Sequence, residues 1–368
     1  MKISDYVESQ IKGLWGTDFD ENGIPVIKTN NLTYEGNIDY SEICKRNITK
    51  EQAKGCYLRP GDLLIEKSGG TKTHSVGYVS YFEGDENKFV CNNFILALRP
   101  KNTINSKFLF YQIQFKYESN QFSDCFNKTT GIQNLKVKDY LAKEIKIYSP
   151  EEQEKIVKEL DTVRSTSNKN KQILEKYDTL IKSRFIEMFS SQKDSFSFCT
   201  LDTVSSRIFA GGDRPKETSE TKNDEFQYPV FANAETNKGL LCYSKTYQVE
   251  LPCVTIAARG CTVGYTEVRN EKFTPVVRLL TIIPTKEIKP LFLKYYLDLE
   301  MKIEGNGAAQ PQLTVPTVKK YQIYVPSLTL QNDFATFVHQ IDKSKFAVQK
   351  SLEKAETLYK SLMQEYFG

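Results

Sequence analysis

The stretch LEKYDTLIKSRFIEMF (174–189) returns near the end of the chain as LEKAETLYKSLMQEYF (352–367), and nine of the 16 aligned positions are identical. The offset is a constant 178 residues, and the same offset pairs NLKV (134–137) with QLTV (312–315). Similarity at a fixed offset indicates that one structural unit has been duplicated. The organisation of the whole chain follows from this repeat.

Upstream of the quoted stretches, EIKIYSP (144–150) corresponds to KYQIYVP (320–326). The repeated unit is therefore a turn, a short strand that ends in proline and a long helix, because proline tends to stand just before a helix start. About 38 residues of helix at 1.5 Å rise make a rod of roughly 55–60 Å. Five heptads favour a coiled coil over a single amphipathic surface helix.

Apolar residues recur along both predicted helices in steps of three and four, with no proline or glycine between them. The first seam comprises Ile156, Leu160, Val163, Leu174, Tyr177, Ile181 and Met188, and the second Phe334, Val338, Ile341, Val348, Leu352, Ala355, Tyr359, Leu362 and Tyr366. The polar run STSNKN (165–170) places Ser167 and Asn170 on the first seam. This run predicts either a polar layer that sets the register or a local fraying of the helix.

The segments between the helices carry strand and turn signals. Their clearest strand candidates are VGYVSYFE (76–83), FVCNNFILALRP (89–100), CVTIAARG (253–260) and VVRLLTIIP (276–284), and each segment has a surface-turn glycine pair, Gly69-Gly70 or Gly211-Gly212. The predicted domains are 1–150 and 191–327, each followed by a long helix, 151–190 and 328–368. We predict an α+β fold of two unlike β-rich domains and two like helices, with a pseudo-two-fold internal repeat.

Composition and charge exclude some classes of protein. No run of 18 apolar residues is present, and the polar MKISDYVESQIKG start argues against an export signal, so we expect a cytoplasmic protein. The eight cysteines contain no C-x-x-C pair, which favours reduced, mostly buried thiols. Residues 1–190 carry 28 basic and 26 acidic side chains and 191–368 carry 22 and 20, so each half is +2. A nucleic-acid partner would therefore need locally clustered positive charge or help from other subunits.

Eight further segments are informative in their order along the chain: PVIKTNNL (25–32), LRPGDLLIEKSGG (58–70), VGYVSYFEGDENKFVCNNFILALRP (76–100), TTGIQNL (129–135), IYSPEEQEKIVKELD (147–161), GGDRPK (211–216), AARGCTVGYT (257–266) and NGAAQPQLTV (306–315). In these segments the chain resembles the specificity (S) subunit of type I restriction–modification systems. The segments span nearly the whole chain, and their order together with the helix duplication is specific.

The resemblance implies two target recognition domains joined by two long helices packed as an antiparallel coiled coil. Each domain would read one half of a split double-stranded DNA site. The helices would set the spacing and dock two methyltransferase (M) subunits. Restriction or motor (R) subunits would join a complex that also cleaves DNA.

A catalytic site is not evident in the sequence, and we expect a protein without enzyme activity or cofactor. The two histidines, His74 and His339, are far apart. SGGTKT (68–73) lacks the Gly-Lys-Ser/Thr order of a nucleotide-binding loop. Glu66 and Lys67 are adjacent, so on a strand they would face opposite sides, unlike a nuclease cluster with Asp62.

Base reading favours Arg, Lys, Asn and Gln, whose donors and acceptors match base edges in the major groove. The candidates in the first domain are Lys28, Asn30, Asn31, Lys67, Ser68, Lys72, Asn127 and Lys128. Those in the second are Arg214, Lys216, Asn233, Asn237, Lys238, Arg259 and Thr262. Those of the first domain lie in loops between apolar strands, where a scaffold can hold them outward. In the second domain, GGDRPK combines a flexible turn with two cations, and AARG ends a strand with an arginine.

Several identical pairs between the helices are charged, which core packing alone would not require. As docking contacts we single out Glu175 with Glu353, Lys182 with Lys360 and Glu187 with Glu365. A solvated helix face remains an alternative for each of them. Two other classes of protein also stay open: a DNA-modifying or DNA-cleaving enzyme with a fused recognition part, and a coiled-coil scaffold without a DNA role.

Overall fold

The computed structural model describes residues 1–71, 74–129, 132–260, 262–301 and 312–368. The chain forms two compact units. Unit 1 combines residues 1–169 with 351–368, and unit 2 comprises residues 170–350. Both long helices, α4 (Pro150–Met188) and α7 (Leu328–Phe367), contribute one end to each unit.

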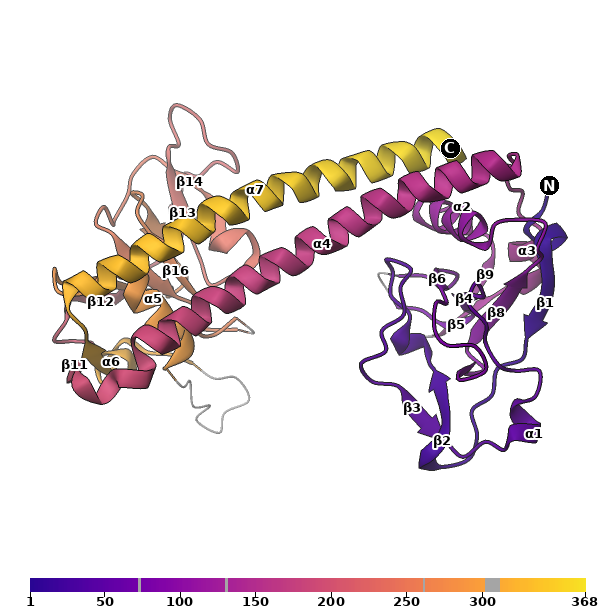
Figure 1. Cartoon of the computed structure of the whole chain (residues 1–368). Coiled ribbons are helices and arrows are strands. Elements are labelled where there is room, and N and C mark those ends of the chain that lie inside the picture. Colours follow the sequence, from indigo (N-terminus) through magenta and orange to yellow (C-terminus); the bar gives the residue numbers. More distant parts are fainter. Residues whose placement is uncertain (72–73, 130–131, 261, 302–311) are drawn as a thin grey trace. The chain divides into compact units, whose positions relative to one another are not determined.

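Unit 1 is built on a four-stranded antiparallel sheet (Figure 1). Its order is β1 (Val7–Ile11), β8 (Ile95–Pro100), β4 (Leu63–Glu66) and β6 (Val79–Tyr81). Two three-stranded sheets follow, β3 (Cys44–Arg46), β2 (Phe19–Ile27) and β7 (Val90–Cys91), and β5 (Ser68–Gly69), β10 (Ile132–Leu135) and β9 (Phe126–Thr129). The shorter helices are α1 (Lys50–Ala53), α2 (Ser106–Glu118) and α3 (Val137–Leu141), with 3-10 turns at Ile3–Tyr6 and Thr29–Asn31.

In the described residues, unit 2 repeats the four-stranded sheet and the three-stranded sheet that has a parallel pair. Its four-stranded sheet has the order β12 (Ser205–Ala210), β18 (Leu280–Pro284), β15 (Cys253–Ile256) and β16 (Thr266–Arg269). Its other sheets are β14 (Leu240–Ser244), β13 (Tyr228–Phe231) and β17 (Thr274–Pro275), and the pair β11 (Ser197–Thr200) and β19 (Gln322–Val325). The helices are α5 (Pro290–Leu299) and α6 (Val315–Lys319), with 3-10 turns at Ser190–Ser195 and Thr236–Gly239.

The globular parts are thus duplicated as well as the helices, although their sequences match poorly. The first strand of each four-stranded sheet has an irregular register at the same place, between Val7 and Ser9 in β1 and between Ser205 and Arg207 in β12. Each has a second sheet with one parallel pair, β2 with β7 and β13 with β17. A bulge at the same position on two dissimilar strands is a designed feature of a fold rather than a defect.

Helices α4 and α7 pack antiparallel. In unit 2, Lys345 pairs with Asp178 at 2.6 Å, and nearer the end of α4 the rings of Phe189 and Phe334 lie 5.5 Å apart. All the predicted seam residues are buried or half-buried. Ser167 and Asn170 are also buried, and α4 continues through them, so the polar run does not fray the helix.

Phe189 and Phe367, which correspond in the sequence repeat, pack into equivalent positions of the two hydrophobic cores. The ring of Phe367, at the end of α7, lies 5.5 Å from Phe108 of α2 in unit 1. The ring of Phe189, just after α4, lies 4.9 Å from Phe292 of α5 in unit 2. Each unit is therefore completed by the end of a helix that begins in the other unit.

Two sequence expectations are wrong in detail. The apolar run VVRLLTIIP is not one strand, because Val277 and Arg278 adopt left-handed backbone angles (φ +52° and +61°) between β17 and β18. Gly211 is not a surface-turn residue but is buried. A Cβ there would lie 2.5 Å from the Pro275 carbonyl, so this glycine permits a close approach of two backbone segments.

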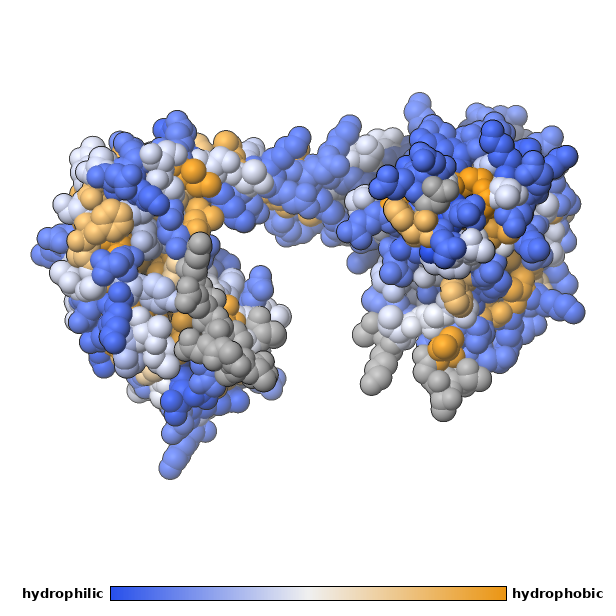
Figure 2. Space-filling model, turned by 90° about the horizontal axis from the view of Figure 1, so that it is seen from below, coloured by the Kyte–Doolittle hydropathy of each residue, from blue (hydrophilic) through white to orange (hydrophobic). Residues whose placement is uncertain are grey.

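The surface seen in Figure 2 is mainly hydrophilic on both units, with smaller hydrophobic areas. None of the helices in the described part of the chain is long and apolar enough to span a membrane. The seven described cysteines are free thiols, and five of them are buried.

Candidate nucleic-acid interface

Shared hydrogen bonds establish which residues of the two units are equivalent. The carbonyl oxygens of Lys67 and Ala258 accept from the N–H groups of the two repeated leucines, at 2.8 and 3.0 Å. The residues that follow, Ser68 and Arg259, therefore occupy the same place on the two scaffolds. Around these two positions the sequences share Ile65 with Ile256, Gly69 with Gly260 and the tripeptide VGY at 76–78 and 263–265, whereas Ser68 and Arg259 themselves differ.

Three candidates of unit 1 lie around the turn Thr29–Asn31. Lys28 is half-buried and Asn30 is exposed. Asn31 is only 4% exposed, and its side-chain oxygen accepts from the N–H of Lys28 at 2.9 Å. Its amide nitrogen donates to the carbonyl groups of Asp39 and Glu42, at 3.1 and 3.2 Å. The side chain of Asn31 holds this loop together and is not free for a base.

A second group of candidates meets on the β5–β10–β9 sheet. Lys67 immediately precedes β5 and is half-buried, and the hydroxyl of Ser68 donates to the side-chain oxygen of Asn134 at 2.6 Å. Asn127 of β9 is the cross-strand partner of Asn134 and is exposed. The sheet thus brings together residues about 60 positions apart in the sequence.

Beneath this sheet lies a buried carboxylate. Glu66 is 7% exposed and accepts from the N–H of Gly70 at 3.3 Å. Burial raises the pKa of Glu66, and its charge raises the pKa values of Tyr34, Tyr78 and Tyr117 further. The ring of His74 stacks on Tyr34 with centroids 3.8 Å apart. These contacts give His74 an aromatic packing role.

In unit 2, two candidates line one cleft. Arg214 and Arg259 border a cleft of about 430 Å³ together with Asp213, Val277 and Arg278. Arg214 donates to the hydroxyl of Thr218 at 2.9 Å. Sequence reasoning missed Arg278, because it lies within an apolar run read as a strand. The signal was present as a single arginine interrupting VVRLL.

Two candidates lie within the turn Thr236–Gly239 and a third, Asn233, lies just before it. Asn237 and Lys238 both have left-handed backbone angles (φ +50° and +52°) and are exposed, and Lys238 pairs with Glu267 at 3.0 Å. Asn233 is committed elsewhere: its nitrogen donates to the Val277 carbonyl, and its oxygen accepts from the Ala258 N–H at 2.8 Å. Asn233 thus positions the cleft rather than entering it.

The remaining DNA candidates are less defined. Lys216 is exposed and Thr262 is half-buried. Lys128 belongs to β9, although its side chain is not described, and Lys72 lies outside the described residues.

The six charged residues proposed for docking are all exposed on α4 and α7. Their surroundings are repeated too. Thr179 donates to the carbonyl of Glu175 at 3.0 Å, and Thr357 donates to that of Glu353 at 2.8 Å. The exposed leucines Leu180 and Leu358 are also a repeated pair.

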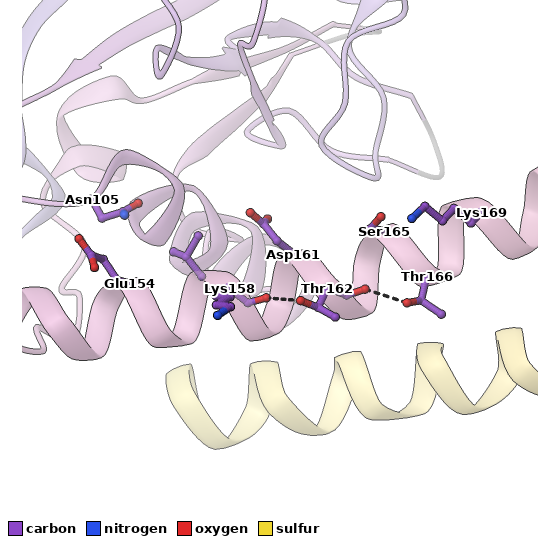
Figure 3. A pocket seen from close by; sticks show the side chains of 9 residues that line it. Asn105, Glu154, Lys158, Asp161, Thr162, Ser165, Thr166 and Lys169 are labelled. Atoms are coloured by element: carbon purple, nitrogen blue, oxygen red, sulfur yellow. Dashed lines mark hydrogen bonds between the residues drawn. The ribbon is translucent and has the colours of Figure 1, made fainter.

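An open groove of about 600 Å³ runs along the first half of α4 (Figure 3). The hydroxyls of Thr162 and Thr166 donate to backbone carbonyls of their own helix, and Asp161 pairs with Lys107 at 3.1 Å. Among the described residues, no cluster of three or more His, Cys, Asp or Glu side chains suits a metal ion.

Comparison with known proteins identifies the class. The sequence pattern of the type I restriction modification DNA specificity domain matches residues 4–176 and 206–356. The chain belongs to this family. The two matches coincide with the two repeats, and the α+β fold of two β-rich domains and two antiparallel helices is confirmed.

Relatives support the same assignment. Two Mycoplasma pneumoniae proteins named as type I specificity subunits, S.MpnORF89P and S.MpnORF507P, are 29% and 26% identical to this chain. The alignments cover 73% and 87% of this chain and 82% and 92% of those proteins. The resemblance to type I specificity subunits that the sequence motifs indicated is therefore confirmed.

Solved structures share the fold at low sequence identity. The crystal structure of the type I restriction-modification S subunit from M. genitalium matches with a TM-score of 0.67 and 16% identity, covering 100% of this chain and 95% of that one. A chain from a study of complex assembly and conformational transition of the type I restriction–modification system matches with a TM-score of 0.54, 16% identity and coverage of 100% and 96%.

Proposed function

We propose that this specificity subunit reads a split double-stranded DNA site, one half with each globular domain, and performs no catalysis itself. In this proposal residues 1–150 and 191–327 are the recognition domains, and 151–190 and 328–368 set their spacing. The single observation that carries the proposal is that one scaffold is present twice while its exposed loops differ. Two unlike readers on one scaffold predict two unlike half-sites.

We further propose the contacts with DNA. Unit 1 contributes Lys28, Asn30, Lys67, Ser68, Lys72, Asn127 and Lys128, and unit 2 contributes Arg214, Lys216, Asn237, Lys238, Arg259 and Thr262. We no longer propose Asn31 and Asn233 as DNA contacts, because their side-chain amides form hydrogen bonds within their own domains. Since a net charge of +4 is small, the bound partner subunits supply part of the attraction to phosphate.

A non-catalytic role is supported by the structural contacts of Asp62 and Glu66, the two carboxylates that could have suggested a nuclease. Asp62 is buried and bound to Arg99 at 2.7 Å, and Glu66 binds a backbone N–H. His74 and His339 belong to different units. Catalysis in the complex would then come from methyltransferase subunits, docked on the repeated charges of α4 and α7. A DNA-reading subunit works where DNA is, so we place it in the cytoplasm.

The test is to co-express the chain with a methyltransferase subunit encoded beside it and to select duplexes retained by the complex from a random-sequence library. The expected result is two short constant blocks separated by a gap of constant length. A single continuous block would mean that only one unit reads DNA. An intact complex that enriches no sequence would refute the proposal.

A further inference from the structure

The inference concerns the tip between β17 and β18 in unit 2 and its counterpart between β7 and β8 in unit 1. Each tip is a four-residue turn, 92–95 in unit 1 and 276–279 in unit 2. In each, the N–H of the fourth residue donates to the carbonyl of the first: Ile95 to Asn92 at 3.2 Å, and Leu279 to Val276 at 3.0 Å. The third residue of the turn is therefore equivalent in the two units. It is Phe94 in unit 1 and Arg278 in unit 2.

The tip in unit 2 is held in a strained conformation. Val277 is β-branched, and a left-handed φ (+52°) is a genuine outlier for such a residue. The N–H groups of Val277 and Arg278 donate to Gly212 and Gly211, at 2.8 and 3.0 Å. The side-chain nitrogen of Asn233 donates to the Val277 carbonyl. Three hydrogen-bonding residues, Gly211, Gly212 and Asn233, thus fix a backbone that would otherwise relax.

This strain does not serve the core. Val277 is 54% exposed, and Arg278 is exposed as well. Backbone strain persists where the surrounding structure over-determines it, and it concentrates at functional positions. The fixed backbone of Val277 and Arg278 instead holds the side chain of Arg278 at a defined, exposed position.

The surroundings of Arg278 suit a nucleic acid. It shares its cleft with Arg214 and Arg259, and Asp213 is the acidic residue of that lining. In the described part of the chain, neither Arg259 nor Arg278 forms an ion pair or hydrogen bond through its guanidinium. Three neighbouring cations with two free guanidinium groups call for a ligand rich in acceptors.

We infer that Arg278 is a base-reading residue of unit 2 and contacts guanine in the major groove, while Arg214 and Arg259 hold the adjacent phosphates. A guanidinium can donate two parallel hydrogen bonds to O6 and N7 of guanine, which is the commonest specific contact of arginine with DNA. Unit 1 places Phe94, 56% exposed, at the same position. The ring of Phe94 cannot donate hydrogen bonds to a base edge, and it suits an apolar group such as the thymine methyl. The two recognition domains therefore present side chains of different chemistry at this equivalent tip position, an arginine in unit 2 and a phenylalanine in unit 1.

This inference rests on the proposed function, and the test separates the two. The selection from a random library is repeated with complexes that carry Arg278→Ala, Arg278→Lys or Phe94→Ala. Arg207→Ala is the matched control, because Arg207 is exposed in unit 2, stacks on Phe209 at 4.2 Å and does not line the cleft. Thermal unfolding of each purified complex checks that the variants fold.

The wild-type complex is expected to select a guanine at one position of one block. Arg278→Ala lowers the preference for guanine at that position about tenfold to hundredfold and leaves the other positions unchanged. Arg278→Lys retains most of the affinity yet loses the same preference, since a lysine lacks the planar fork. Phe94→Ala alters a position in the other block only, and Arg207→Ala alters none.

Three outcomes would overturn the inference. The first is an unchanged motif with Arg278→Ala. The second is an equal loss of affinity for all sequences with a shallower salt dependence, which marks a phosphate contact alone. The third is that both tip variants alter the same block. Failure of the wild-type complex to select any motif would instead refute the proposed function.

Discussion

Glu66 is a buried carboxylate that, in the part of the chain the structure describes, accepts one hydrogen bond, from the backbone N–H of Gly70. Its raised pKa means that the folded protein binds this proton at a higher pH than the unfolded chain does. Stability therefore falls as the pH rises from the unfolded pKa of roughly 4.3 through the folded pKa, and the penalty stays in full above that. Three tyrosines, Tyr34, Tyr78 and Tyr117, surround the group and add no positive charge.

We predict that Glu66→Gln raises the melting temperature at pH 7 and that the gain disappears below about pH 4, where the wild-type carboxyl is protonated in both states. The amide oxygen of glutamine can still accept from Gly70. Thermal unfolding of both proteins across this pH range provides the measurement. Glu8→Gln, at an exposed position of β1, is the control. A gain that is independent of pH would contradict the role assigned to the charge.

Gly211 and Gly212 are neighbours with opposite surroundings. A Cβ at Gly211 would meet backbone atoms of Pro275 at 2.5 Å, whereas one at Gly212 would meet nothing within 4 Å. We predict that Gly211→Ala lowers the free energy of unfolding of unit 2 by about 1–3 kcal/mol, because backbone must shift. Gly212→Ala should change it by less than about 0.5 kcal/mol. Denaturant titration of both variants measures this, and equal effects would show that the close approach is unimportant.

At the scale of elements, one glutamine at the start of each long helix ties that helix to the start of a shorter helix in the same unit. Gln153 and Gln331 are 3% and 0% exposed. Each accepts from the N-cap residue of a shorter helix, Asn105 before α2 at 2.9 Å and Lys289 before α5 at 2.8 Å. Each also donates to the carbonyl five residues before it, at 2.9 Å. The duplication is therefore preserved in hydrogen bonds as well as in topology.

We predict that Gln153→Ala and Gln331→Ala each destabilise their own unit by about 1–3 kcal/mol, since buried backbone groups lose their partners. Hydrogen exchange should accelerate in α2 for the first variant and in α5 for the second. The two effects should add in the double variant, because the residues share no partner. Gln172→Ala, at an exposed position of α4, serves as the control. Faster exchange in both units from one substitution would argue against separate units.

At the scale of the whole molecule, the chain presents the same exposed charges twice, once on α4 and once on α7. Two like surfaces on one chain can bind two copies of one partner. If the proposed docking is correct, each copy of the surface binds one methyltransferase subunit independently of the other.

We predict that Glu175→Lys with Glu187→Lys removes one methyltransferase subunit from the complex, and that Glu353→Lys with Glu365→Lys removes one as well. All four changes together should remove both, because repulsion replaces attraction at both surfaces. Native mass spectrometry of the co-purified complex counts the subunits. Glu154→Lys is the control, since its repeat counterpart is the uncharged Asn332. Loss of both subunits from a change in one copy would contradict independent docking.

Sequence alone determined the repeat, the two long helices, their seams and the family, because helical periodicity and duplicated side chains are local patterns that survive in the order of residues. It did not determine the equivalence of the two β-rich domains, which lies in strand pairing between residues distant in the chain. Nor could it distinguish Asn31 and Asn233, whose amides are used internally, from exposed candidates such as Asn30. The exposed position of Arg278 could not be predicted from the sequence either. Its left-handed backbone depends on hydrogen bonds to Gly211 and neighbouring loops, and no local preference of Val-Val-Arg predicts it. Only the tertiary structure brings those partners together.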